Sequence, residues 1–198
     1  MSSGSASPIN LTNQFLIAMP GMGDDHFAGS VVYLCEHTER GALGLVINKP
    51  IDITVASLFE RVEMALERED LAEVPVHFGG PVQTERGFVL HDPQPAPEGE
   101  HSPFQSTLSV PGGLAMTTSK DVLEALAAGG GPSRVLVTLG YSGWSAGQLE
   151  EEISRNGWLT VDADPRVIFD TPVAARYQRA VELLGIDPRM LSSDAGHA

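Results

Sequence analysis

The amino-acid sequence predicts one domain that combines helices with strands. Its 198 residues suit a single domain, and its 42% apolar and 19% charged residues are ordinary for a globular protein. Short apolar runs typical of strands are interleaved with amphipathic stretches typical of helices, and neither a repeat nor a linker divides them. We therefore expect residues 1–10 to form a flexible lead and residues 11–198 to form one mixed domain.

The strand predictions rest on short apolar runs that end at glycine or proline. They place strands at residues 15–19, 31–37, 42–48, 76–78, 87–91, 108–110, 114–117, 134–139, 158–161 and 167–169. Thr38 to Gly41 joins the second and third runs, which predicts a hairpin with glycine at its tight end. Residues 140–144 are expected to leave the strand at 134–139 as a loop.

Helices are predicted where a capping residue precedes an apolar face. Thr54 can cap a helix whose far side continues into the charged run at 60–73, which we expect to be a solvated helix face. Ser145 and Gln148 form a capping-box pair for a helix over 149–156. The remaining helices are expected over 119–128 and, behind Thr171 and Pro172, up to residue 184.

The charge balance limits the classes of partner. Twelve basic residues stand against 26 acidic ones, which gives a formal net charge of −14. Nucleic acids gain affinity when basic residues neutralise their phosphates, and an acidic surface repels them. We therefore expect no direct nucleic-acid binding, and an unidentified protein partner is the preferred alternative.

The chain carries no signal for another compartment. Its single cysteine, Cys35, excludes an intramolecular disulfide. Residues 1–10 lack the basic and apolar regions of a signal peptide, and the apolar runs are too short to cross a bilayer. We expect a cytoplasmic protein that does not insert into membranes.

One segment fits a catalytic motif. Gly143-Trp144-Ser145-Ala146-Gly147 matches the G-x-S-x-G nucleophile elbow. However, Ser145 lies several residues beyond the predicted strand, and the histidine that follows it, His197, is next to the C-terminus. A helix-capping role explains Ser145 without catalysis, so no catalytic residue is predicted.

Cys35 and His37 are two residues apart in a predicted strand, which places both side chains on the same face. A neighbouring imidazolium can lower a thiol pKa and produce a reactive thiolate. The alternative is that Cys35 is a small core residue among apolar neighbours. The histidines have no metal-binding spacing, so neither a metal nor another cofactor is expected.

Several motifs, read together, resemble the AlgH/YqgE family of bacterial proteins. They are FLIAMPGM (15–22), SVVYLCEH (30–37), GALGLVINKP (41–50), GGPV (79–82), RGFVLH (86–91), TSKD (118–121), LGYSGW (139–144), GQLE (147–150) and AGHA (195–198). The string LGYSGW followed by GQLE is the most specific. The resemblance extends from about Leu11 to the C-terminus.

The resemblance implies an α+β fold, in which a bifurcated, strongly curved sheet forms a pseudo-barrel beside helices. It also implies a cytosolic protein, in a family whose members are mostly uncharacterised. The family name refers to a regulatory role in alginate production, and the family label is that of a transcriptional regulator. This describes a genetic effect and supplies no catalytic or cofactor-binding residues.

Glycine and proline follow four predicted strands, in residues 19–22, 48–50, 79–81 and 140–144. If those strands run parallel, the four segments meet at one sheet edge, where α/β folds bind ligands. We then expect an anionic small molecule there, bound by these residues: Lys49, Arg86, Tyr141, Trp144 and Gln148. The alternative is that the glycines form ordinary turns and the cations pair with surface carboxylates.

Three functional classes remain open at this point. The preferred one is a regulatory or adaptor protein that acts through protein contacts, because the chain is acidic and lacks a catalytic motif. The second is a small-molecule-binding protein or an enzyme of unknown reaction. The third is a DNA-binding transcription factor, which rests on the family label alone.

Overall fold

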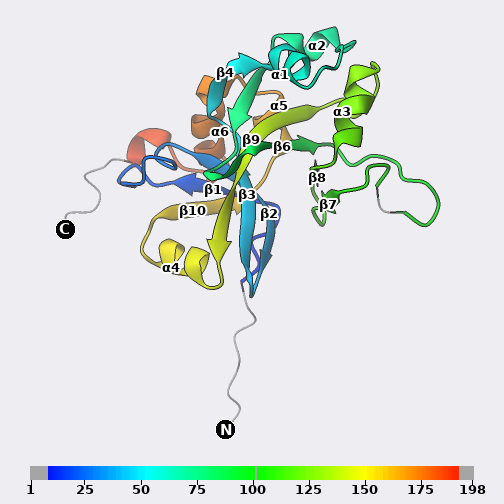
Figure 1. Cartoon of the computed structure of the whole chain (residues 1–198). Helices are drawn as coiled ribbons and strands as arrows, with labels where there is room; N and C mark the ends of the chain where they lie inside the picture. The colour runs from blue at the N-terminus through cyan, green and yellow to red at the C-terminus, as the bar shows by residue number, and fades with distance from the viewer. Residues whose placement is uncertain (1–8, 101, 192–198) are drawn as a thin grey trace.

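The computed structural model describes residues 9–100 and 102–191 (Figure 1). Its ten strands form one sheet. They are β1 (Gln14–Ala18), β2 (Val31–Thr38), β3 (Gly41–Val46), β4 (Pro50–Thr54), β5 (Pro75–Phe78), β6 (Val82–His91), β7 (Thr107–Ser109), β8 (Ala115–Thr117), β9 (Val135–Ser145) and β10 (Trp158–Asp162). The described residues also form six α-helices: α1 (Val55–Arg61), α2 (Glu69–Ala72), α3 (Lys120–Ala127), α4 (Gln148–Ser154), α5 (Pro165–Phe169) and α6 (Arg176–Glu182). Two short 3₁₀ turns lie at Val173–Ala175 and Pro188–Met190.

The sheet branches at β9. The first half of β9 pairs with β6 in antiparallel and with β5 in parallel orientation, whereas the second half pairs with β3. The full order is β10-β1-β2-β3-β9-β6-β8-β7, and β4 pairs with β5 outside this path. This mostly antiparallel sheet curls into a half-barrel, which confirms the α+β class and the curved, bifurcated sheet.

Glycines make the branch point possible. A Cβ atom on Gly80 would overlap the carbonyl group of Tyr141, and one on Gly140 would overlap the carbonyl oxygen of Gly80. Gly140 also has a φ of +77°, a conformation that side chains disfavour. The two chain segments therefore pass each other so closely that only glycine fits at these positions.

Three apolar clusters fill the space around the sheet. The first lies inside the half-barrel and includes Phe15 and Tyr33, with Val167 of α5 and Val181 of α6. The second lies under α4 and contains both tryptophans of the chain. The third lies between the sheet and the helices α1 and α3. Figure 1 shows α1 and α3 at one end of β9 and α4 at the other.

Two sequence predictions about β9 and α5 are wrong. Residues 140–144 belong to β9 and do not form a loop, since their backbone pairs with β3 and β6. Residues 167–169 belong to α5 and do not form a strand. Pro165 lies in the first turn of α5, and the Asp164 side chain accepts a hydrogen bond from the backbone N–H of Arg166. Periodicity cannot separate a short buried strand from a short buried helix.

The charged run at 60–73 is not one solvated helix face. The helix α1 is capped by Thr54 as predicted, but it ends at Arg61 and α2 begins only at Glu69. Met64, Leu66 and Leu71 from this run pack into the third cluster. The strand β4 was missed because Pro50 was interpreted as the end of a strand, although proline is tolerated as the first residue of an edge strand.

The predicted lead up to residue 8 and the AGHA motif lie outside the described residues. None of the described helices is long and apolar enough to cross a membrane.

Candidate functional site

The predicted site residues do not form one cluster: Lys49 is apart, Arg86 contacts Phe88 beside Tyr141, and Trp144 lies with Gln148, although Tyr141 and Trp144 also line one hollow. The strands that were expected to run parallel do not: β1 and β3 run in one direction and β5 and β9 in the other. The glycines at 79–80 and 140 serve the close strand crossing described above. The argument that gathered the five residues at one sheet edge is therefore not supported.

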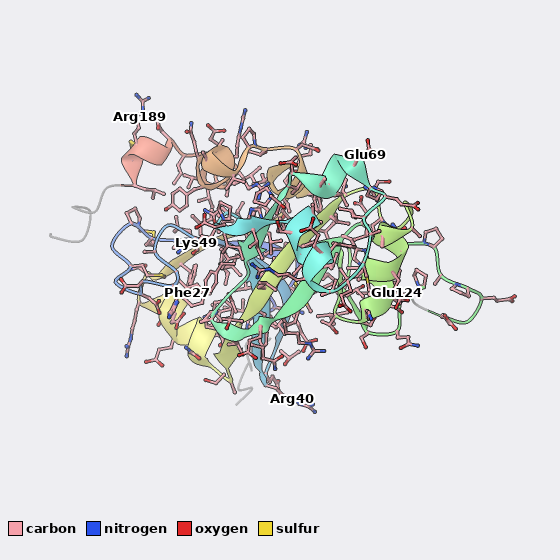
Figure 2. The ribbon with its side chains drawn as sticks, turned by 45° about the horizontal axis from the view of Figure 1, so that its top comes forward. Phe27, Arg40, Lys49, Glu69, Glu124 and Arg189 are labelled. Atoms are coloured by element: carbon pink, nitrogen blue, oxygen red, sulfur yellow. The ribbon has the colours of Figure 1, made fainter. Side chains whose placement is uncertain are left out.

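Lys49 lies by itself. Its Nζ donates a hydrogen bond to the carbonyl oxygen of His26 over 2.8 Å. The imidazole of His26 in turn stacks on Phe78, with 6.1 Å between the ring centroids. Partial burial lowers the pKa of Lys49. Figure 2 shows Lys49 on the side that carries Phe27, away from Glu124 of α3.

Arg86 and Tyr141 both contact one phenylalanine, Phe88. The guanidinium carbon of Arg86 is 5.8 Å from the centroid of the Phe88 ring. The same ring meets Tyr141 edge to face, with centroids 5.4 Å apart. Arg86 thus reaches the rim of the sheet through a cation–π contact.

Trp144 and Gln148 lie together with Glu152. The Trp144 indole Nε1 donates to Glu152 Oε2 over 2.9 Å, and Gln148 Nε2 donates to Glu152 Oε1 over 3.1 Å. Gln148 Oε1 also accepts the backbone N–H of Ser145 over 3.0 Å. One half of the predicted capping box is therefore present, but the residue that caps α4 is Gly147 and not Ser145.

Ser145 and Cys35 lack the environment of a nucleophile. The Ser145 hydroxyl is exposed and donates to Gln148 Oε1 over 3.2 Å. Cys35 is buried, and its thiol contacts the carbonyl oxygen of Tyr33. Burial, assisted by the charge of Glu36, raises the pKa of the Cys35 thiol.

Cys35 and His37 do not share a face as predicted. A β-bulge between Leu34 and Glu36 shifts the register of β2 against β3. Cys35 packs in the first cluster, inside the half-barrel. His37 Nδ1 accepts the backbone N–H of Leu11 over 3.0 Å, and its Nε2 contacts Glu150 of α4, on the other side of the sheet. Sequence alternation cannot anticipate a bulge.

A largely apolar hollow lies between α1 and α3, and we call it the α1–α3 cleft. Its volume is about 210 Å³. Its walls are apolar side chains of α1, α3, β6 and β9: Leu58, Val62, Val89, Val122, Leu123, Val137 and Leu139. The backbone of Gly87 and polar side chains complete the lining: Glu85, Arg86, Thr117, Thr118, Ser119 and Lys120.

The rim of the cleft is cationic. Across residues 9–100 and 102–191, neither Arg86 nor Lys120 forms an ion pair, although the chain has a net charge of −14. Asp121, beside Lys120, instead accepts the backbone N–H of Gln105 over 2.8 Å and the hydroxyl of Ser119. Desolvation by itself would raise the pKa of Asp121, but these hydrogen bonds outweigh it and the pKa is lowered.

The sequence argument included Arg86 but missed Lys120 and Glu152. Lys120 stands in the TSKD motif at the start of a predicted helix, so its position at a helix end was visible. Nothing in the sequence showed that this end faces α1. Glu152 is one of three consecutive glutamates, and only the fold shows which of them meets the tryptophans. No group of three potential metal ligands occurs in the described part of the chain.

Comparisons with known proteins agree on one family. A family model described as AlgH-like matches residues 15–189. A UPF0301 protein of Ralstonia nicotianae is 67% identical over 192 residues, which cover 97% of each chain. A UPF0301 protein of Paraburkholderia phytofirmans is 64% identical over 196 residues, 99% of this chain and 100% of the relative.

Solved structures show the same fold. The solution structure of the AlgH protein from Pseudomonas aeruginosa has a TM-score of 0.75 and 48% identity, and the similarity covers 100% of both chains. A crystal structure of a Corynebacterium diphtheriae protein has a TM-score of 0.64 at 20% identity, over 90% of this chain and 89% of the other, and shows likeness of fold alone. With its motifs, its sheet and its relatives in agreement, the chain belongs to the AlgH-like family.

Proposed function

We propose that this chain is a regulatory binding protein whose ligand is a small anion with an apolar body, held in the α1–α3 cleft. The observation that carries the proposal is an apolar hollow with Arg86 and Lys120 in its lining. Neither cation has an ion-pair partner in the described residues, and the Arg86 guanidinium is held only by the Phe88 ring and a hydrogen bond of 3.4 Å to Gln83. Six of the twelve cations form no ion pair in the described residues, so the support comes from the place of these two beside one apolar hollow, where an anion can meet both.

The walls of the cleft set the character of the ligand. Val89 and Val137 are buried in the third cluster and offer apolar contact at the base. Burying an apolar group there gains free energy in proportion to the area removed from water. The volume of about 210 Å³ is below the range typical of drug-sized ligands, so the ligand is small.

A hydroxyl group at the rim favours an oxyanion. Thr118 lines the cleft close to Lys120, and its hydroxyl forms no hydrogen bond within the described residues, whereas the Ser119 hydroxyl already donates to Asp121. A carboxylate or phosphate accepts hydrogen bonds from hydroxyl and cationic donors alike. Glu85 also lines the cleft and opposes an anion, so we assign the anionic end of the ligand to the side of Lys120 and Arg86.

The regulatory part of the proposal concerns protein contacts. The net charge of −14 disfavours polyanions and favours basic protein partners, which supports an adaptor or regulator over a direct reader of DNA. A binding role is also favoured over nucleophilic catalysis by Ser145 and Cys35. The Ser145 hydroxyl donates to the amide of Gln148, and burial raises the pKa of the Cys35 thiol.

Calorimetric titration of the whole chain with hexanoate and with hexanol tests the ligand class. We expect hexanoate to bind and hexanol, which lacks the charge, to bind at least about tenfold more weakly. Arg86→Gln and Lys120→Gln should each weaken hexanoate binding several-fold, and the double variant by about tenfold or more.

Arg40→Gln is the matched control, because it removes the same charge from an exposed residue outside the cleft. It should leave hexanoate binding unchanged. Equal binding of hexanoate and hexanol, or equal losses in all three single variants, would contradict a specific anion site in the cleft.

A further inference from the structure

A second hollow lies on the opposite side of the molecule, and we call it the tryptophan pocket. It has a volume of about 270 Å³ and lies between the loop that follows β1, the helix α4 and the start of β10. Its lining residues are Met22, Gly23, Asp24, Phe27, Glu152, Arg155, Gly157 and Trp158. Figure 2 shows Phe27 in the loop beside α4.

Phe27 and Trp158 line this pocket, and Trp144 packs against both rings. Phe27 stacks on Trp144 with 5.9 Å between centroids, and it meets Trp158 edge to face at 5.5 Å. The two indoles are 6.0 Å apart and nearly perpendicular. Aromatic faces carry partial negative charge, so such a group attracts a cation placed against it.

Glu152 is fixed at the pocket by neutral donors. The indole N–H groups of Trp144 and Trp158 both donate to Oε2, over 2.9 and 2.8 Å. Gln148 Nε2 donates to Oε1 over 3.1 Å. These three bonds hold the carboxylate in one orientation but do not cancel its charge, which leaves a preorganised anion beside aromatic rings.

The three glutamates at the start of α4 have different partners. Successive residues of a helix point about 100° apart. Glu150 contacts His37, and Glu151 forms an ion pair of 2.6 Å with Arg155. Glu152 alone of the three lines the tryptophan pocket. Arg155, which stands at the rim, is therefore already bound to a different carboxylate.

Negative charge in the pocket is only partly compensated, since Lys49 interacts with Asp24 without forming an ion pair and Arg155 pairs with Glu151. As far as the chain is described, no basic side chain forms an ion pair with Glu152 or with Asp24, the second carboxylate of the lining. A pocket whose two carboxylates form no ion pair, with Phe27 and Trp158 in its walls, is complementary to an organic cation and unfavourable for an anion.

We propose that the tryptophan pocket binds the ammonium or guanidinium head group of a lysine or arginine side chain presented by a partner protein. The aliphatic stem of such a side chain lies against Met22 and Phe27, and its charged end meets Glu152 and Asp24. The net charge of −14 attracts a basic partner to this surface. This site is independent of the α1–α3 cleft.

Intrinsic fluorescence tests the proposal directly, because Trp158 lines the pocket and Trp144, the other tryptophan of the chain, lies 6.0 Å from it and donates to the same Glu152 oxygen. The full chain is titrated with the acetylated amides of lysine, arginine and norleucine. We expect a saturable fluorescence change for lysine or arginine at roughly millimolar concentration, which weakens as salt is added. Norleucine, which lacks the charge, should bind at least about tenfold more weakly.

Glu152→Gln should weaken binding of the cationic amide by about tenfold or more, whereas Glu150→Gln, on the same helix but in contact with His37 outside the pocket, should not. Because Glu152→Gln also alters the indole hydrogen bonds, Asp24→Asn serves as a second variant that leaves those bonds in place and should weaken binding as well. Norleucine binding as tightly as lysine and arginine would overturn the proposal. So would the absence of any saturable change, or full binding in both Glu152→Gln and Asp24→Asn.

Discussion

Nε1 of Trp144 lies 2.9 Å from Oε2 of Glu152, so a carboxylate of α4 accepts the hydrogen bond that a buried indole N–H in β9 needs. Glu152→Ala removes this acceptor for Trp144 and for Trp158, which donates to the same oxygen. A buried donor without a partner costs about 1–3 kcal/mol. We expect the free energy of unfolding, measured with urea, to fall by roughly 2–4 kcal/mol.

Glu151→Ala is the control for that measurement. It breaks an exposed ion pair with Arg155, and such pairs contribute about 0.3–0.5 kcal/mol. If Glu152→Ala unfolds at the same urea concentration as Glu151→Ala, the indole bonds do not contribute to stability.

Gly80 tests the strand crossing at the branch of the sheet. Gly80→Ala places a Cβ on the carbonyl group of Tyr141 and forces a side chain into a φ of +154°. We expect a loss of more than about 3 kcal/mol in the free energy of unfolding, or failure to fold. Gly87→Ala is the control, since its Cβ meets no atom within 4 Å. Equal stability of the two variants would contradict the proposed crossing.

Cys35 should be slow to react in the native protein. Burial raises the pKa of its thiol, and the thiolate is the form that alkylating reagents attack. We expect iodoacetamide to label Cys35 at least about tenfold faster in urea than under native conditions at neutral pH. Rapid native labelling would instead favour the reactive thiol that the Cys35–His37 spacing suggested.

His77 should make stability depend on pH. Burial is the main cause, and the charge of Arg176 the second, that lowers the pKa of His77 to about 4 in the folded chain. A histidine in the unfolded chain has a pKa of about 6.5. Between these values the unfolded chain binds more protons, so stability falls as pH falls from about 6.5 to about 4. This single group should cost about 2 kcal/mol between pH 7 and pH 5.

His77→Gln isolates that contribution. His91 is also buried and its pKa is also lowered, so the native chain should lose stability in acid for more than one reason. The difference between the urea unfolding free energies at the two pH values should shrink by about 2 kcal/mol in the variant. If the variant and the native chain lose the same unfolding free energy between pH 7 and pH 5, protonation of His77 does not destabilise the folded chain.

Much of the fold could be predicted from local patterns. The hairpin of β2 and β3, the cap of α1 by Thr54 and the hairpin of β7 and β8 follow from turn residues and alternation. The continuation of β9 through Gly140 could not be predicted. A glycine at this position suggests a loop, but here it lets the strand pass close to Gly80. The helix at Val167 is equally ambiguous, since a short apolar run fits either structure.

The candidate sites were less predictable than the fold. Arg86 is predicted from the sequence as a cation near the expected sheet edge, and it does line the α1–α3 cleft, but the strands do not run in the directions that this prediction requires. Lys120 joins it through the packing of α3 against α1 and β6, a contact between segments far apart in sequence. Likewise, Glu152 is distinguished from Glu150 and Glu151 only by the direction in which each side chain leaves α4.

Methyl NMR of the whole chain during a hexanoate titration tests the anion site most directly. Methyl signals of Leu58, Val89 and Val137 should shift saturably, because these side chains line the α1–α3 cleft, while those of Val167 and Val181 in the first cluster should stay in place. The shifts should disappear in the Arg86→Gln, Lys120→Gln double variant. Saturable shifts confined to other parts of the molecule, or unchanged cleft shifts in the double variant, would contradict the anion site.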